Sequence, residues 1–245
     1  MRNIKLTIEY DGTNYHGWQI QKNAVTVQEI TEKALSKLLG YQIGLTGCSR
    51  TDVGVHAYGQ VAHFLTDSNI PGDKFSYALN NLLPEDIVIR KSEEVSEDFH
   101  SRYSSKGKKY RYLIYNAAHP SAIMRNKANH VRPELNMEDM KAAAQYFIGL
   151  HDFEAFQATG GQVRSTIREI YSMDVYNNEN GLISIDVSGN GFLYNMVRII
   201  AGTLIYVGMG KIPSNQISEI IESRDRTKAG KTAPAHGLYL MEIFY

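Results

Sequence analysis

Cysteine is nearly absent from this sequence of 245 residues, because Cys48 is the only one and cannot form a disulfide within the chain. Long apolar runs are absent too, since Arg198 and several Gly, Asn and Ser residues interrupt residues 187–210, the longest stretch with few charges. The start of the chain lacks the apolar core and cleavage site of a signal peptide. No segment has the composition of a disordered region. We therefore expect a folded, cytoplasmic protein without a membrane-spanning segment.

Net charge is also absent, because 26 basic side chains balance 26 acidic ones. The charge of the whole molecule therefore gives no indication of a nucleic-acid partner. The distribution is uneven, however, and one basic run without an acidic residue contains Arg102, Lys106, Lys108, Lys109 and Arg111. Such a run can bind phosphates. It can equally be a solvated basic loop that leads into a strand, and the run alone leaves both interpretations open.

The usual signatures of cofactor binding are missing. Neither the phosphate-binding pattern GxxxxGK[ST] nor the dinucleotide pattern GxGxxG occurs, so no nucleotide cofactor is expected. Cys48, His56 and His63 lie close in sequence, but their spacing matches no standard zinc pattern and a second pair of ligands is absent. We predict that the protein uses no metal and no cofactor.

Hydrophobic periodicity predicts two successive series of strands and helices. The first series comprises a strand at 5–11, a helix from Thr26 to Gly40, strands at 42–48 and 59–66, a helix near 75–83, and a strand at 87–95. The second comprises a strand at 109–115, a helix capped by Asn136, a hairpin of 164–176 and 182–187, a helix near 192–207, and a strand at 238–244. An additional helix at about 214–222 precedes the last strand.

Both series have the order strand, helix, strand, strand, helix, strand, which is typical of a ferredoxin-like, split β-α-β unit. We predict an α+β fold with two ferredoxin-like halves, residues 1–105 and 106–245, that join in one mainly antiparallel sheet. A cleft between such halves is a common place for an active site.

The segment SRTDVGVHA, residues 49–57, is the first candidate for chemistry. Asp52 follows Arg50 by two residues in a loop between predicted strands. A nearby guanidinium lowers the pKa of a carboxyl group and keeps it ionised as a nucleophile. The alternative is an Asx turn with a structural ion pair, and the local pattern alone favours that alternative.

Two further residues attract attention in the second half of the chain. Tyr110 begins the strand after the basic run, where its ring can stack on a base, although alternation with Tyr112 and Ile114 favours a core position. Arg198 is the only charged residue between Asp186 and Lys211, in a predicted helix that is apolar nearly all round. Because burial of an unpaired guanidinium is costly, we expect a carboxylate partner, with Asp52 and Asp186 both open.

Taken together, motifs along nearly the whole chain resemble the tRNA pseudouridine synthase A family. They are YDGTNYHGWQIQ (10–21), TVQ (26–28), SRTDVGVHA (49–57), ALNNLLPEDI (78–87), FHSRYSSKGKKYRYLIYN (99–116), GFLYNMVRIIAG (191–202) and TAPAHGLYL (232–240). The family modifies uridines 38, 39 and 40 in the anticodon stem and loop of tRNA. The resemblance implies tRNA as substrate, a two-part fold with a basic cleft, and a homodimer with tRNA across both subunits.

The resemblance also implies roles for particular residues. Asp52 matches the catalytic aspartate and Arg50 the arginine that pairs with it. Tyr110 matches the tyrosine that packs on the target base, Arg198 the helix arginine that faces the active site, and Leu238 an apolar pocket residue. Lys106, Lys108 and Lys109 are expected to bind tRNA phosphates. Two departures from the family pattern are Ser49 in place of a glycine and Ala235 in place of a proline.

Three other functions remain open on the sequence. An RNA-binding module that lost catalysis would keep the fold without turnover, and a carboxylate-dependent N-glycosidase would stop after cleaving the base. An α+β enzyme acting on small molecules would not bind tRNA. The intact set of Asp52, Arg50 and Tyr110 favours the synthase.

Overall fold

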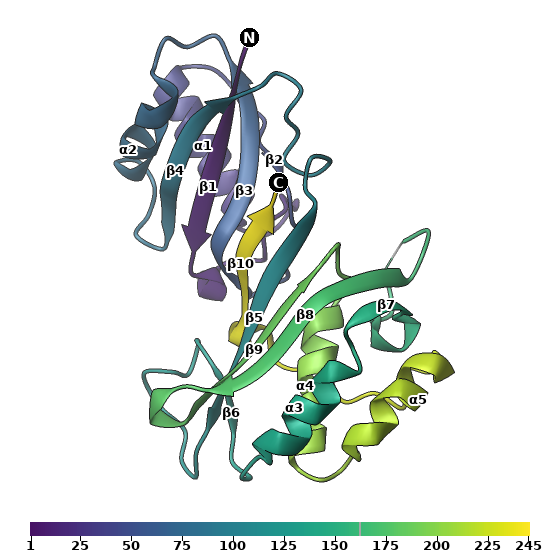
Figure 1. Cartoon of the computed structure of the whole chain (residues 1–245). Coiled ribbons are helices and arrows are strands. Elements are labelled where there is room, and N and C mark those ends of the chain that lie inside the picture. The colour runs from purple at the N-terminus through teal and green to yellow at the C-terminus, as the bar shows by residue number, and fades with distance from the viewer. Residues whose placement is uncertain (162) are drawn as a thin grey trace. The chain divides into compact units, whose positions relative to one another are not determined.

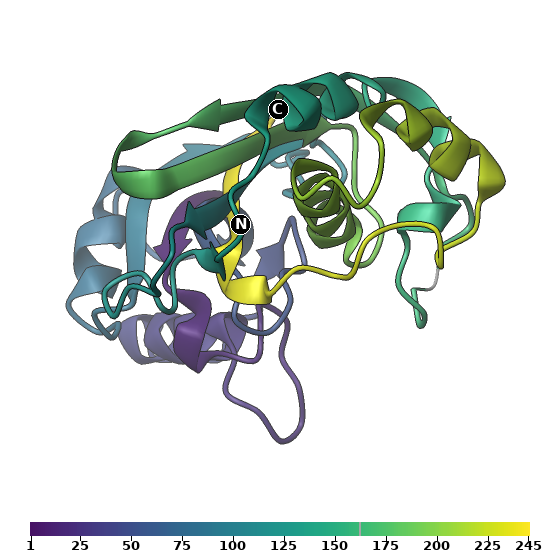
Figure 2. The ribbon, with the colours of Figure 1, turned by 90° about the horizontal axis from the view of Figure 1, so that it is seen from below.

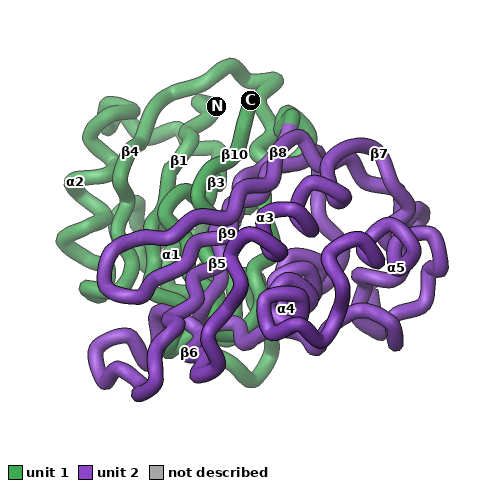
Figure 3. Tube along the Cα trace, turned by 60° about the horizontal axis from the view of Figure 1, so that its bottom comes forward, with its two compact units in different colours: residues 1–106, 239–245 green, residues 107–238 purple. Residues whose placement is uncertain are grey.

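The computed structural model describes residues 1–161 and 163–245, and the chain divides into two compact units (Figure 3). Unit 1 consists of Met1–Lys106 and Tyr239–Tyr245, and unit 2 consists of Gly107–Leu238. The end of the chain is thus part of the unit that contains its beginning. The division of function between residues 1–105 and 106–245 stays a prediction.

Unit 1 combines a sheet with two helices (Figure 1). Its strands lie in the order β4 (Ile87–Val95), β1 (Arg2–Tyr10), β3 (His56–Thr66) and β10 (Leu238–Phe244), and the short β2 (Thr46–Gly47) pairs with β3. All pairs are antiparallel except β3 with β10. The helices α1 (Val27–Leu39) and α2 (Phe75–Asn80) contact each other, and α2 packs on β4.

The sequence explains the main elements of unit 1. Alternate residues of β1 are apolar, and Ile4, Leu6 and Ile8 are completely buried, as a strand with one face on the core requires. Helix α1 begins after Thr26, whose side chain accepts a hydrogen bond from the Glu29 amide at 3.3 Å. It ends at Gly40, which has a left-handed φ of 80°.

Unit 2 combines mainly antiparallel strands with three helices (Figure 1). Its strands lie in the order β5 (Gly107–Asn116), β9 (Leu182–Gly189), β8 (Ile167–Asn177) and β7 (Gly149–Asp152), while β6 (Asn129–Val131) runs parallel to β5. The helices are α3 (Met137–Gln145), α4 (Met196–Gly208) and α5 (Ile217–Ser223). The predicted hairpin is confirmed, with Asn180 at a φ of 60° in its turn.

Two predicted elements differ in length. The predicted strand at 42–48 shrinks to Thr46–Gly47, because the Leu45 amide donates to Glu32 Oε1 at 2.8 Å and the Leu45 carbonyl accepts from Gln28 Nε2 at 2.9 Å. Side chains of α1 thus take the backbone groups that a strand would use. Helix α4 begins at Met196 and not near residue 192, because Asn195 has a φ of 59°.

The mixed α+β class with a mainly antiparallel sheet is confirmed. Within the described ranges, no helix has the length and apolar character needed to cross a bilayer. The described His, Cys, Asp and Glu side chains also form no group of three or more that would hold a metal ion.

Candidate active site

The loop that carries Asp52 lies in unit 1 between β2 and β3. Arg50 is exposed and Asp52 is half-buried. The Val55 amide donates to the Asp52 carbonyl at 3.1 Å, and Gly54 between them has a φ of 75°, so the loop is a tight turn. A positive φ at the third position of such a turn favours glycine. This turn is closed by the main-chain carbonyl of Asp52, so it is distinct from the Asx turn of the alternative, which would use the side chain. Both that alternative and the catalytic role of Asp52 stay predictions.

The start of this loop is fixed by the neighbouring strand. Gln60 of β3 is completely buried, and its Nε2 donates to the Ser49 carbonyl at 2.6 Å while its Oε1 accepts from the Ser49 amide at 3.2 Å. Ser49 has a φ outside the left-handed region, so the serine fits this backbone without strain. Its hydroxyl is buried and has no hydrogen-bond partner among the described residues.

Tyr110 lies in unit 2 on the face of β5 that packs on the core. It is only 8% exposed, Tyr112 and Ile114 of the same row are completely buried, and the Tyr110 ring meets Phe192 edge to face at 5.2 Å. The core position favoured by the alternation is confirmed. Because successive side chains of a strand point to opposite faces, Lys108 shares the face of Tyr110.

Arg198 of α4 donates two hydrogen bonds to neutral groups within unit 2. Its Nη1 donates to Asn195 Oδ1 and its Nε to the Ala233 carbonyl, each at 2.8 Å. The Ala233 amide donates back to the Arg198 carbonyl at 3.0 Å. These bonds fix the direction of the guanidinium before any substrate arrives. A carboxylate partner for Arg198 stays a prediction.

The segment 230–238 runs past α4 in Figure 2 and binds both α4 and β5 within unit 2. A Cβ on Gly202 of α4 would lie 1.7 Å from the Lys231 carbonyl oxygen, so helix and segment are in direct contact. Tyr112 donates to the Pro234 carbonyl at 2.9 Å, and burial raises the pKa of this phenol. Leu238 at the end of the segment is 6% exposed. The segment therefore fixes the Tyr110 strand relative to the Arg198 helix.

Sequence reasoning missed the partners that orient these site residues. Gln60, Asn195 and Ala233 make contacts that no spacing rule reveals. Only their membership in recurring motifs, GFLYNMVRIIAG for Asn195 and TAPAHGLYL for Ala233, could have indicated them.

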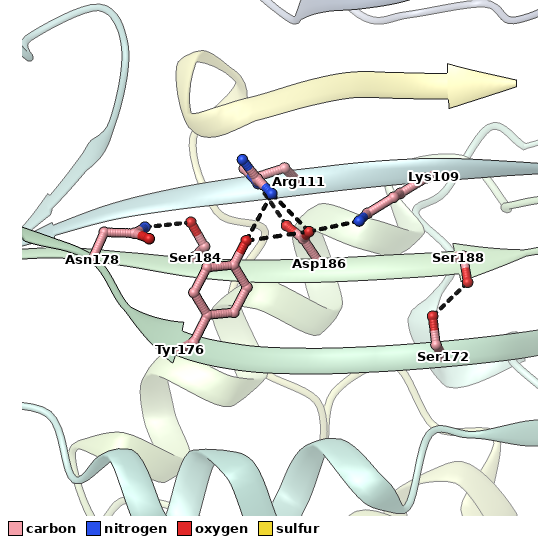
Figure 4. Close-up of polar contacts among 8 residues, drawn as sticks. All are labelled: Lys109, Arg111, Ser172, Tyr176, Asn178, Ser184, Asp186 and Ser188. Atoms are coloured by element: carbon pink, nitrogen blue, oxygen red, sulfur yellow. Dashed lines mark hydrogen bonds and ion pairs between the residues drawn. The ribbon is translucent and has the colours of Figure 1, made fainter.

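The opposite face of β5 carries an ion-pair cluster (Figure 4). Asp186 of β9 is 5% exposed and accepts from Arg111 Nε at 2.6 Å, from Arg111 Nη2 at 2.8 Å, and pairs with Lys109 Nζ at 2.9 Å. Tyr176 accepts a further bond from Arg111 Nη2 at 2.7 Å. Burial works to raise the pKa of Asp186, but the two cations outweigh it and hold that pKa below its ordinary value.

The residues of the basic run do not share one surface. Lys109 and Arg111 lie on the face that carries Asp186, whereas Lys108 lies on the face of Tyr110. Arg102 and Lys106 are exposed before the strand begins. Lys109 therefore forms an ion pair with the buried Asp186 carboxylate.

Unit 1 carries the Asp52 loop, and unit 2 carries Tyr110 and the oriented Arg198. A sequence model described as tRNA pseudouridine synthase matches residues 6–104 and 143–245. The chain therefore belongs to the tRNA pseudouridine synthase family, as the motifs predicted.

Individual relatives agree with this assignment along the whole chain. A protein of Ruminiclostridium cellulolyticum named tRNA pseudouridine synthase A is 77% identical over 245 residues, with 100% of both chains covered. A protein of the same name from Acetivibrio thermocellus is 57% identical with the same coverage.

Among solved structures, the archaeal box H/ACA sRNP Nop10-Cbf5 complex contains a chain with a TM-score of 0.37 and 10% identity. That match covers 97% of this chain and 46% of the other, so this chain spans about half of its length. A likeness this weak carries no argument about function.

Proposed function

We propose that this protein converts uridine to pseudouridine at positions 38, 39 and 40 in the anticodon stem and loop of tRNA. The observation that carries the proposal is the full-length identity of 77% to a protein named tRNA pseudouridine synthase A. The loop with Asp52 two residues after Arg50, which Gln60 fixes at Ser49, supports it. In this proposal Asp52 is the nucleophile.

The reaction is an isomerisation. The bond between N1 and C1′ breaks, the uracil turns, a bond forms between C5 and C1′, and the C5 proton is lost while N1 gains a proton. No electrons enter or leave, so a carboxylate suffices and no redox cofactor is needed. Asp52 adds either to C1′ after glycosidic cleavage or to C6 of the ring, and both routes require the ionised carboxylate.

The other site residues have supporting roles in the proposal. Arg50, two residues before Asp52, keeps the carboxylate ionised by its positive charge. Tyr110 packs on the uracil and assists the late proton transfer. Arg198, whose guanidinium is oriented by Asn195 and Ala233, adds positive charge, and Leu238 supplies an apolar contact.

Binding of tRNA offsets the cost of extracting the target base. Removing a base from its stack costs a few kcal/mol, and phosphate contacts help to offset this cost. Lys106, Lys108 and Lys109 are the candidates for these contacts, and Lys109 also pairs with Asp186 at 2.9 Å. The predicted homodimer and the predicted cytoplasmic location are part of the same proposal.

The test is turnover of tRNA by the purified protein. We expect pseudouridine at positions 38 to 40 when these are uridine, and no product in a tRNA with cytidine at all three. Release of free uracil would instead indicate an N-glycosidase. Binding of tRNA without any product would indicate a module that has lost catalysis.

A further inference from the structure

The segment 10–18, which contains YDGTNYHGW, holds the Asp52 loop from both sides within unit 1. The Trp18 amide donates to the Thr51 carbonyl at 3.1 Å, on the N-terminal side of Asp52. On the C-terminal side, the Gly54 amide donates to the Tyr15 carbonyl at 3.3 Å. Because these bonds flank the nucleophile in the chain, they restrict the backbone on which its carboxylate sits.

Two glycines allow this close approach. A Cβ on Gly17 would lie 2.3 Å from the Thr51 carbonyl oxygen, and a Cβ on Gly12 would lie 2.0 Å from the Val55 carbonyl oxygen. Gly17 also has a φ of 82°, which other residues rarely adopt. The two backbones therefore touch at both ends of the turn, with no room for side chains between them.

One side-chain contact reaches the residue immediately before the nucleophile. The Tyr10 hydroxyl and Thr51 Oγ1 are 2.7 Å apart, and the two residues are only 3% and 8% exposed. The Tyr10 ring stacks against Trp18 with centroids 6.2 Å apart, so the phenol is itself held in place. A hydrogen bond shielded from water in this way fixes the Thr51 side chain and the peptide that leads to Asp52.

We propose that Tyr10 and Thr51 are positioning residues for the nucleophile, and that their hydroxyl pair keeps the Asp52 carboxylate in the geometry required for attack. This inference rests on the proposed function of the same site. Neither side chain is assigned a contact with the substrate. Their loss should therefore lower kcat, because reactive geometry is lost, while the affinity for tRNA is retained.

The first variant is Tyr10→Phe, which removes only the hydroxyl oxygen. We expect kcat for pseudouridine formation to fall about tenfold, with KM within about twofold of the parent value. Thr51→Val should have the same effect because it keeps the shape of the side chain without a hydroxyl. Thr51→Ser, which keeps the hydroxyl, should restore most of the rate.

The double variant separates positioning from stability. Each single variant breaks the bond between the two hydroxyls and leaves one of them in place, whereas Tyr10→Phe combined with Thr51→Val removes both. We expect the thermal unfolding temperature of the double variant to recover toward that of the parent. Its kcat should stay as low as in the single variants, because the pair acts as one unit. A purely structural pair would instead recover rate and stability together.

The chain offers a matched control in the same unit. Tyr41 and Thr66 also form a hydroxyl pair of 2.7 Å, but Thr66 ends β3 at the end opposite the Asp52 loop. Tyr41→Phe removes a bond of the same kind and should leave kcat unchanged. The inference is overturned if Tyr10→Phe keeps the parent kcat, if it raises KM alone, or if Tyr41→Phe lowers kcat equally. An inactive parent protein would refute the proposed function instead.

Discussion

Ser49 directly precedes Arg50, and its buried hydroxyl has no hydrogen-bond partner in the part of the chain that the structure describes. A buried hydroxyl without a partner lowers the free energy of unfolding. We predict that Ser49→Ala raises the free energy of unfolding by about 1 kcal/mol. Urea denaturation of the two proteins measures the difference. A loss of stability would show that the hydroxyl has a role in the folded protein.

At the scale of single residues, the sequence predicts candidate site residues but not their contacts. The local pattern around Asp52 favours a turn, and the main chain does turn between Asp52 and Val55. Only the set of motifs predicts a nucleophile at this position. For Arg198, the charged partner stays a prediction, and the hydrogen bonds to the neutral Asn195 and Ala233 were not predicted. Hydrogen-bond partners such as a backbone carbonyl or a side-chain amide are brought together by folding, so composition and residue spacing do not predict them.

Strand β9 contributes to stability through Asp186 in a manner that depends on pH. The folded protein holds the pKa of Asp186 below its ordinary value of 3.8, because Arg111 and Lys109 favour the ionised form despite burial. The stabilisation is therefore fully present above the unfolded pKa, and it is lost as the pH falls through the lower, folded pKa.

We predict that Asp186→Asn lowers the free energy of unfolding at pH 7 by about 2 kcal/mol. This is less than for a fully buried pair, because both cations remain partly in water. The difference between parent and variant should shrink once the pH falls below about 3.8. A difference that stays constant from pH 7 to pH 3 would exclude the ion pairs as its source.

The close packing of helix α4 against the segment 230–238 can also be tested by substitution. A Cβ on Gly202 would lie 1.7 Å from the Lys231 carbonyl oxygen, so Gly202→Ala must displace the segment. We predict a loss of about 2 kcal/mol in the free energy of unfolding and a lower kcat, because Ala233 also orients Arg198. Thermal unfolding and turnover assays measure the two effects.

Gly208 of the same helix provides the control. There a Cβ would meet the flexible Met140 side chain, with the sulfur 2.8 Å away, so Gly208→Ala should cost less stability and leave kcat unchanged. Equal losses in the two variants would indicate a general effect on the helix and not a displaced segment.

Most strands and helices followed from periodicity and capping residues, while the exceptions depended on tertiary contacts. The predicted strand at 42–48 was mostly wrong because Gln28 and Glu32 of α1 bind the Leu45 backbone. The short strands β6 and β7 were missed, since three or four residues are too few for a periodic signal. Whether such short segments form strands, and where they end, depends on contacts with residues distant in the sequence.

For the whole molecule, recognition of tRNA should depend on salt through a few cations. Each phosphate contact that is lost reduces the slope of log Kd against log salt concentration by about one. We predict that Lys106→Ala combined with Lys108→Ala reduces this slope. A slope unchanged by the double substitution would place these lysines away from the RNA.

The α+β class of the whole molecule was predictable from its sequence. The assignment of the last residues to a compact unit was not predictable. The order of elements gave two α+β series, but residues 239–245 belong to the unit formed by residues 1–106. Pairing between the ends of a chain leaves no local signal, since Tyr239 pairs with His56 across most of the sequence.

The central claim is that Asp52 is the nucleophile of a tRNA pseudouridine synthase. Its most direct test is single-turnover release of tritium from tRNA labelled at uridine C5, measured with the parent protein and with Asp52→Asn. We predict release by the parent and none above background by the variant, with Kd for tRNA within about twofold of the parent value. Substantial release by Asp52→Asn would contradict the claim.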